Sequence, residues 1–156
     1  MEKNPDIVAS SCSIEYVDEV TKKSTIRSRP NDPNKLIIYS KYHAPLSHAA
    51  SIIRLKTLKE VGGYPNLRRS QDVCLWHLFI SKNLKISNQD FVGYRVFIDK
   101  NFISRLSFNT FFLEIKAISY VFSIRNFSIF WFITLIIKRL ILSALPSFII
   151  RYFYVK

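Results

Sequence analysis

The adjacent glycines Gly62 and Gly63 constrain this chain more than any other feature of its sequence. They follow residues 54–61, a run of good helix formers, and glycine is the usual residue at the left-handed position that ends a helix. Beyond the turn, Ser70 is suited to cap a second helix, so that Asp72 falls in its first turn, near unpaired backbone N–H groups. The sequence therefore predicts two helices joined by a turn, with an ionised carboxylate at the start of the second helix.

The segment before these helices has the pattern of extended structure. Residues 7–16 and 24–29 are candidate strands, and the polar run 18–23 between them predicts a hairpin. Residues 28–34 contain two prolines and predict a loop, whereas the apolar residues 36–39 predict a short buried run. Together with the two helices, this order indicates an α/β fold.

A series of short motifs surrounds the glycine turn in a fixed order. In chain order the motifs are Pro-Leu-Ser-His at 45–48, Gln-Asp at 71–72, Leu-Trp at 75–76, strand-like segments at 84–87 and 91–97, and Tyr-Arg at 94–95. The series resembles the acceptor-side, C-terminal half of family 2 glycosyltransferases, and it spans roughly residues 1–97. Ala44 departs from the family pattern, in which Asn is common at that place.

The resemblance implies a partial nucleotide-diphospho-sugar transferase (GT-A) fold, in which residues 1–100 form a mixed sheet edge with helices. It also implies transfer of a sugar, with inversion, from a nucleotide-sugar donor to a saccharide or lipid-linked acceptor in surface polysaccharide biosynthesis. By the same resemblance, Asp72 is the general base that takes the proton from the acceptor hydroxyl. The residues expected around the donor or acceptor pocket are Gln71, His48, Gly63, Arg68, Arg69 and Trp76.

Each of these side chains also has a purely structural interpretation. Asp72 would then be a first-turn acid that stabilises the helix dipole, and Trp76, at helical spacing with other apolar residues, would belong to the core. Arg68 and Arg69 either approach phosphate oxygens, which match guanidinium geometry, or belong to a solvated loop. His48 is either a pocket residue or a histidine at the end of a strand.

The features that hold a nucleotide diphosphate are missing from the sequence. It contains no Asp-x-Asp motif, through which resembling enzymes bind the diphosphate by a bridging metal, and its three glycines form no phosphate-binding loop. We therefore expect a truncated or split enzyme that lacks the nucleotide-binding half and is inactive alone. This chain is expected to bind no cofactor itself, and Mg²⁺ or Mn²⁺ is expected only together with the missing half.

The sequence offers little support for a metal site or a disulfide. Cys74 and His77 are three residues apart, but a structural zinc site needs four ligands at a recognised spacing. Cys12 and Cys74 are expected to be reduced thiols, with Cys74 in the core.

Residues 101–156 differ in composition from residues 1–100 and are expected to form a hydrophobic, basic, helical tail. The first hundred residues hold 16 Lys and Arg against 10 Asp and Glu, and the tail holds 7 against 1. Cations set singly among Phe, Ile and Leu favour an anionic membrane surface as the partner. Nucleic acid is not expected as a partner, because its binding patches normally cluster basic residues with polar spacers.

The apolar run 127–150 is long enough to cross a membrane, but its central charges oppose insertion. Its fifteen Leu, Ile and Phe residues contribute roughly −4.5 to −9 kcal/mol, and Lys138 with Arg139 cost roughly 5 to 7 kcal/mol. Pro146 disturbs a continuous span, and a polar stripe at helical spacing is formed by Arg139, Ser143, Ser147 and Arg151. We expect helices that lie on the cytoplasmic face of the inner (plasma) membrane, with a spanning segment or a helix packed on protein as alternatives.

A second functional class remains open at this level. The absence of donor-binding motifs also suits a non-catalytic, membrane-attached remnant or an interaction module. In resembling enzymes a C-terminal Leu-Pro-Ser-Phe, here residues 145–148, often places the site beside the inner leaflet.

Overall fold

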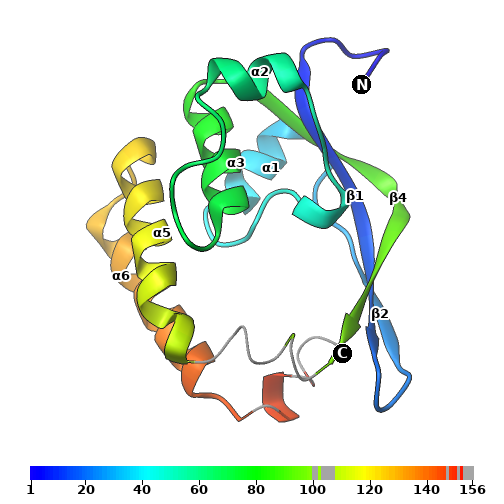
Figure 1. The fold of residues 1–156 in the computed structure, drawn as a ribbon, viewed down its shortest axis with the longest axis vertical. Coiled ribbons are helices and arrows are strands. Elements are labelled where there is room, and N and C mark those ends of the chain that lie inside the picture. Colours follow the sequence, from blue (N-terminus) through cyan, green and yellow to red (C-terminus); the bar gives the residue numbers. More distant parts are fainter. Residues whose placement is uncertain (100–101, 103–107, 147, 151, 153–156) are drawn as a thin grey trace.

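A computed structural model of the chain describes residues 1–99, 102, 108–146, 148–150 and 152. Figure 1 shows three layers: a twisted sheet, a middle layer with the helices α1 and α3, and an outer pair of helices, α5 and α6. The predicted α/β class is therefore confirmed. The layers are connected by α3, which contacts both the sheet and α5.

The N-terminal hairpin is confirmed. Strand β1, Ile7–Asp18, pairs antiparallel with β2, Ser24–Arg27, in a register that sets Ile14 opposite Arg27. The turn is held by Asp18, whose Oδ1 accepts hydrogen bonds from two backbone N–H groups of the turn, at 2.7 and 3.1 Å. Local polar chemistry thus closes the hairpin where the sequence predicts it.

The two strand-like segments that the sequence predicts after α3 are one long strand. Strand β4, Lys85–Ile98, runs parallel to β1, while the short β3, Ile52–Ile53, pairs antiparallel with β1. The sheet is therefore mixed, as predicted. The register of β4 shifts opposite Cys12–Ile14, and a Cβ on Gly93 would lie 2.6 Å from Cys12 Sγ, so only glycine permits this approach.

The prediction for residues 28–39 is wrong in its second half. Helix α1, Pro33–Tyr39, begins at the predicted loop: Asp32 caps it by accepting from Lys35 N at 2.8 Å, and proline suits the first helical position. Only Leu36 of the apolar run is fully buried, and Ile37 and Ile38 are exposed. A helix that packs one face on the core leaves the residues of its other face exposed, whereas a strand covered on both faces buries consecutive side chains.

The two predicted central helices are confirmed as α2, Leu55–Glu60, and α3, Gln71–Ser81, with a short 3₁₀ turn, η1, His48–Ala50, before them. A hydrophobic cluster joins α3 to the sheet. Its largest fully buried members are Leu36, Leu46, Leu75, Trp76 and Phe79. This cluster fixes the orientation of α3, and hence of the residues at its start.

The tail is helical, as predicted, and it packs on α3. The 3₁₀ turn η2, Phe108–Thr110, leads into α5, Phe111–Arg125, and α6, Ile129–Ala144. A second cluster contains Cys74 of α3 together with Ala117, Val121 and Trp131 of the tail helices. The described part of the tail is therefore attached to the rest of the fold by an apolar contact.

The described helices are all too short or too polar to cross a membrane. Helix α6 has 16 residues, which corresponds to about 24 Å, against a hydrocarbon core of about 30 Å.

Of the predicted polar stripe of the tail, Arg139 faces protein and Ser143 is partly exposed. Arg139 is 8% exposed and its Nη2 donates to Thr110 Oγ1 at 2.7 Å, while Ser143 donates to the carbonyl of Leu140 within its own helix. The other two predicted members, Ser147 and Arg151, lie outside the described residues. Ser147 is also the serine of the Leu-Pro-Ser-Phe motif.

Candidate functional site

The glycine turn before α3 has the predicted conformation. Gly62 and Gly63 have φ values of +88° and +79°, and Gly63 N donates to the carbonyl of Leu58 at 2.8 Å. A Cβ at either glycine would meet nothing within 4 Å. The turn therefore requires glycine for its backbone conformation and not for lack of space.

Asp72 lies in the first turn of α3 and is half-buried. Its carboxylate makes no hydrogen bond or ion pair with any residue that the structure describes. The charge of Asp72 adds to burial in raising the pKa of Tyr64, and it acts in the same sense on Cys74. The carboxylate therefore lies near both side chains and keeps its oxygens available to a further group.

Three rings lie beside the start of α3 and include two of the predicted pocket residues. The exposed His48 contacts Tyr64 edge to face, with ring centroids 5.7 Å apart, and lies 6.2 Å from the ring of Trp76. Trp76 is 0% exposed. The structural interpretation therefore holds for Trp76, which supports the cluster from the core and cannot serve as an open stacking surface.

The two arginines before α3 have different environments. Arg69 forms an ion pair with Glu114 of α5 through its Nε, so it connects the loop before α3 to α5. Its guanidinium is therefore engaged by a carboxylate and is not the arginine open to phosphate that the sequence suggested. Arg68 is exposed. Gln71 is exposed too, but its side-chain amide donates to the carbonyl of Leu67 and stabilises the loop.

Ser70 occupies the predicted cap position without capping the helix. Its backbone is left-handed, with φ 55° and ψ 30°, and its side chain accepts no hydrogen bond from the first turn. The hydroxyl instead donates to Glu114 Oε2 at 2.9 Å. A capping serine normally has an extended backbone and accepts from an N–H of the first turn, so the left-handed backbone of Ser70 accounts for the missing cap.

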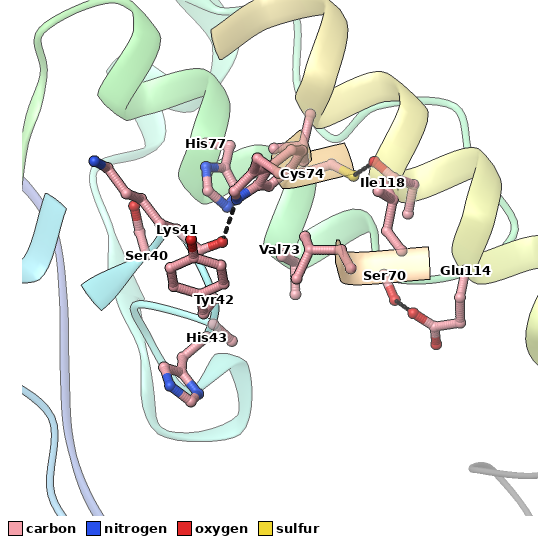
Figure 2. A pocket seen from close by; sticks show the side chains of 15 residues that line it. Ser40, Lys41, Tyr42, His43, Ser70, Val73, Cys74, His77, Glu114 and Ile118 are labelled. Carbon is pink, nitrogen blue, oxygen red and sulfur yellow. Dashed lines mark hydrogen bonds between the residues drawn. The ribbon is translucent and has the colours of Figure 1, made fainter. Parts of the chain in front are cut away.

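A cavity of about 140 Å³ lies against α3 (Figure 2). Its walls come from the segment 40–44, from α3, and from α5 and α6. None of the predicted site residues lines this cavity, although Ser70 and Glu114 do. The sequence predicted neither the cavity nor the role of Glu114, yet one signal was present: Glu114 is the only acid among residues 101–156.

His77 lies on the wall of this cavity and is 3% exposed. Burial, with a smaller contribution from the positive charge of Arg125, lowers the pKa of His77 to about 3. Cys74 is a free, buried thiol whose Sγ donates to the carbonyl of Ala117 at 3.6 Å, and burial raises its pKa to about 12. The expectation of a reduced core cysteine is thus confirmed for Cys74.

The described residues include no cluster of three or more His, Cys, Asp or Glu side chains that could hold a metal ion. Comparison with known proteins finds no matching family model, no matching curated protein and no matching solved structure. A carboxylate that makes no hydrogen bond within the described structure, near a tyrosine that packs on an exposed imidazole, can accept a proton from a hydroxyl.

Proposed function

We propose that this chain is the acceptor-side part of an inverting glycosyltransferase with a GT-A fold. It would transfer a sugar from a nucleotide-sugar donor to a saccharide or lipid-linked acceptor in surface polysaccharide assembly. The observation that supports the proposal is the uncommitted carboxylate of Asp72 at the start of α3. It follows the left-handed Gly62-Gly63 turn in the motif order that resembles family 2 enzymes.

In this reaction Asp72 is the general base. The acceptor hydroxyl attacks the anomeric carbon from the face opposite the nucleoside diphosphate, the bond to the diphosphate breaks, and the hydroxyl proton passes to the carboxylate. A carboxylate on a helix that is fixed by a packed core is held in one orientation, which this step requires. The exposed His48 is suited to contact the acceptor sugar, because its ring packs on Tyr64, a side chain that lies near Asp72.

The donor would be held by a nucleotide-binding half outside these 156 residues, together with Mg²⁺ or Mn²⁺. The described residues offer no metal cluster to this task, and Arg69 is engaged by Glu114.

The decisive experiment measures sugar transfer from nucleotide sugars to a membrane extract, with and without an added nucleotide-binding half of a family 2 enzyme. We expect transfer only with both parts, and an Asp72→Asn variant should lower the rate by about 10²- to 10⁴-fold. Asp90→Asn, which changes an exposed acid on β4, is the matched control and should transfer normally. Equal rates for Asp72→Asn and the unchanged chain would rule out the base.

We further propose that the chain binds peripherally to the cytoplasmic face of the plasma membrane through α6. Its outward face is apolar and exposed, and consists of Ile129, Phe130, Ile133, Ile137, Leu140 and Ile141. Both cations of the helix contact protein: Lys138 donates to the carbonyl of Tyr42 and Arg139 to Thr110. An apolar stripe this long on a helix surface favours a lipid or protein cover.

Flotation with vesicles of phosphatidylglycerol and phosphatidylcholine tests the attachment. Burying one isoleucine contributes about 1.5–3 kcal/mol, so Ile133→Glu or Ile137→Glu should weaken vesicle binding by roughly tenfold or more. Ile26→Glu introduces the same change at an exposed position of β2 and should bind like the unchanged chain. Flotation that is insensitive to both α6 variants would contradict the proposed face.

The same apolar face also suits the alternative function, a non-catalytic membrane-attached remnant or interaction module. The transfer assay separates the two functions. A chain that floats with vesicles but supports no transfer with any added nucleotide-binding half belongs to the second class.

A further inference from the structure

Two cations from distant parts of the chain are fixed on either side of His43. Lys138 of α6 donates through Nζ to the carbonyl of Tyr42 at 3.2 Å, and Arg29 donates through Nε to the carbonyl of Ala44 at 3.0 Å. These carbonyls belong to the residues before and after His43, so both positive charges lie close to its imidazole. The proposed transfer reaction uses none of these side chains.

The imidazole of His43 is held in place but is open to a ligand. Its ring stacks on Tyr39 of α1, with ring centroids 4.6 Å apart and an angle of 23° between the planes. The side chain is exposed and makes no hydrogen bond with the residues that the structure describes. Lys138 is exposed too, and only one of the three N–H donors of its ammonium group is used by Tyr42.

The charges that act on His43 are all positive. Burial lowers the pKa of His43, and the charges of Lys138, Arg29 and Arg27 lower it further. Cations gathered in this way repel one another, so an anion between them would be stabilised by several charges at once. The same anion would favour the protonated form of His43, which then becomes a further donor.

A terminal phosphate group matches this arrangement of donors. It has three free oxygens and about two negative charges near neutral pH, whereas a phosphodiester in a nucleic acid has two free oxygens and one charge. Lys138 also lies on the helix that exposes Ile137 and Ile141. A phosphate bound to Lys138 would therefore lie beside apolar surface, which favours a lipid over a nucleic acid as its carrier.

We propose that His43, Lys138 and Arg29 form a binding site for the terminal phosphate group of a membrane lipid. The lipid as the source of the phosphate rests on the proposed attachment of α6 to the membrane. Recognition of the phosphate group itself does not depend on that attachment or on Asp72.

Inorganic phosphate is the probe for the site alone. The full chain in a non-ionic detergent, labelled with ¹⁵N at its three histidines, is titrated with phosphate and, for comparison, with sodium chloride at equal ionic strength. We expect phosphate to shift the ring resonances of His43 and to raise its pKa, while those of His48 and His77 stay unchanged. In Lys138→Gln the pKa of His43 should be higher without phosphate and should respond less to it.

Vesicle flotation tests the lipid as the source. Vesicles of phosphatidylcholine with phosphatidic acid present a terminal phosphate, and vesicles of phosphatidylcholine with oleic acid present a carboxylate instead. Lys138→Gln should weaken binding to the phosphatidic acid vesicles by about fivefold, the contribution of one cation at an anionic surface, and should abolish the preference over oleic acid. Lys59→Gln, at an exposed position of α2, is the matched control and should bind like the unchanged chain.

The two arms fail separately. Unshifted His43 resonances at saturating phosphate would overturn the site, as would equal losses in Lys138→Gln and Lys59→Gln. If Lys138→Gln fails to fold, His43→Gln takes its place in the flotation assay, where an unchanged preference for phosphatidic acid would overturn the site. A response of His43 to phosphate without any preference for phosphatidic acid, or with tighter binding to an oligonucleotide, would overturn the lipid as the source.

Discussion

At the scale of single residues, the region before α3 shows how one carboxylate decides the roles of its neighbours. Glu114 accepts from both Arg69 and Ser70, so the guanidinium of Arg69 is already engaged and the hydroxyl of Ser70 is directed to α5. Asp72, two residues further on, makes no such contact among the described residues. The carboxylate of Glu114 is hydrogen-bonded and that of Asp72 is not, and this difference is the basis for proposing a chemical role for Asp72.

The glycine turn gives a prediction for stability. In Gly62→Ala the new Cβ meets no neighbour, so only the left-handed backbone is strained, and we expect a loss of about 1–2 kcal/mol in the free energy of unfolding. Urea denaturation measures this loss. Lys56→Ala, at an exposed position of α2, should change stability by less than about 0.5 kcal/mol. Similar values for the two variants would show that the turn tolerates a side chain.

His77 predicts a dependence of stability on pH. Its pKa is about 3 in the folded chain and about 6.5 when unfolded, so the unfolded state binds more protons between these values. Its contribution to stability is complete above about pH 6.5 and decreases as the pH falls, by up to about 1.4 kcal/mol per pH unit. His77→Leu should remove this slope between pH 6.5 and 5, above the range where Asp6 and Glu15 titrate.

The comparison is made by urea denaturation at several pH values. The same slope in the unchanged chain and in His77→Leu would mean that His77 is not buried as described.

At the scale of elements, the ion pair between Arg69 and Glu114 connects the loop before α3 with α5. Both side chains are largely covered, with exposures of 24% and 20%, so the pair is screened less than a surface pair. A double-mutant cycle with Arg69→Met and Glu114→Gln should give a coupling energy of about 1 kcal/mol in thermal or urea unfolding.

The pair Arg95–Glu15 is the control for this cycle, because Arg95 is 59% exposed. The same kind of cycle there should give less than about 0.5 kcal/mol. A coupling at Arg69–Glu114 no larger than the control value would show that packing, and not the ion pair, fixes α5 on α3.

The elements also show what local patterns can and cannot predict. The β1–β2 hairpin and the helices on either side of Gly62-Gly63 follow from turn chemistry and helix propensity, which act between neighbours in sequence. The register of β4 on β1 joins segments about eighty residues apart, and its shift opposite Cys12 depends on contacts that no local pattern contains. The exposure of Ile37 and Ile38 on α1 likewise depends on which face meets the sheet.

At the scale of the whole molecule, β4 forms a long sheet edge. Among the described strands it pairs only with β1, and it exposes Phe91, Tyr94 and Phe97. Unpaired edges with apolar side chains promote self-association. We expect Phe91→Lys to reduce the apparent mass at high concentration in light scattering, without changing the circular dichroism of the chain. An unchanged mass would indicate that the edge is protected.

The candidate site could be predicted only in part, for a reason that applies to the whole chain. Asp72 and the glycine turn belong to one continuous stretch, so their proximity follows from the sequence. The proximity of Asp72 to Tyr64, the ring contact of His48 with Trp76 and the ion pair of Arg69 with Glu114 come from tertiary packing. Long-range packing also assembles the cavity at His77, which the sequence did not predict.

The chain has two tryptophans, and each belongs to a different hydrophobic cluster: Trp76 to the sheet cluster and Trp131 to the tail cluster. Both are buried, so the fluorescence emission of each should move to longer wavelength when its own cluster opens. The chain thus carries a built-in optical reporter for each layer. In Trp76→Phe the remaining Trp131 reports on the tail cluster, and in Trp131→Phe the remaining Trp76 reports on the sheet cluster. Comparing the midpoints of the two fluorescence melting curves shows whether the tail detaches before the sheet unfolds.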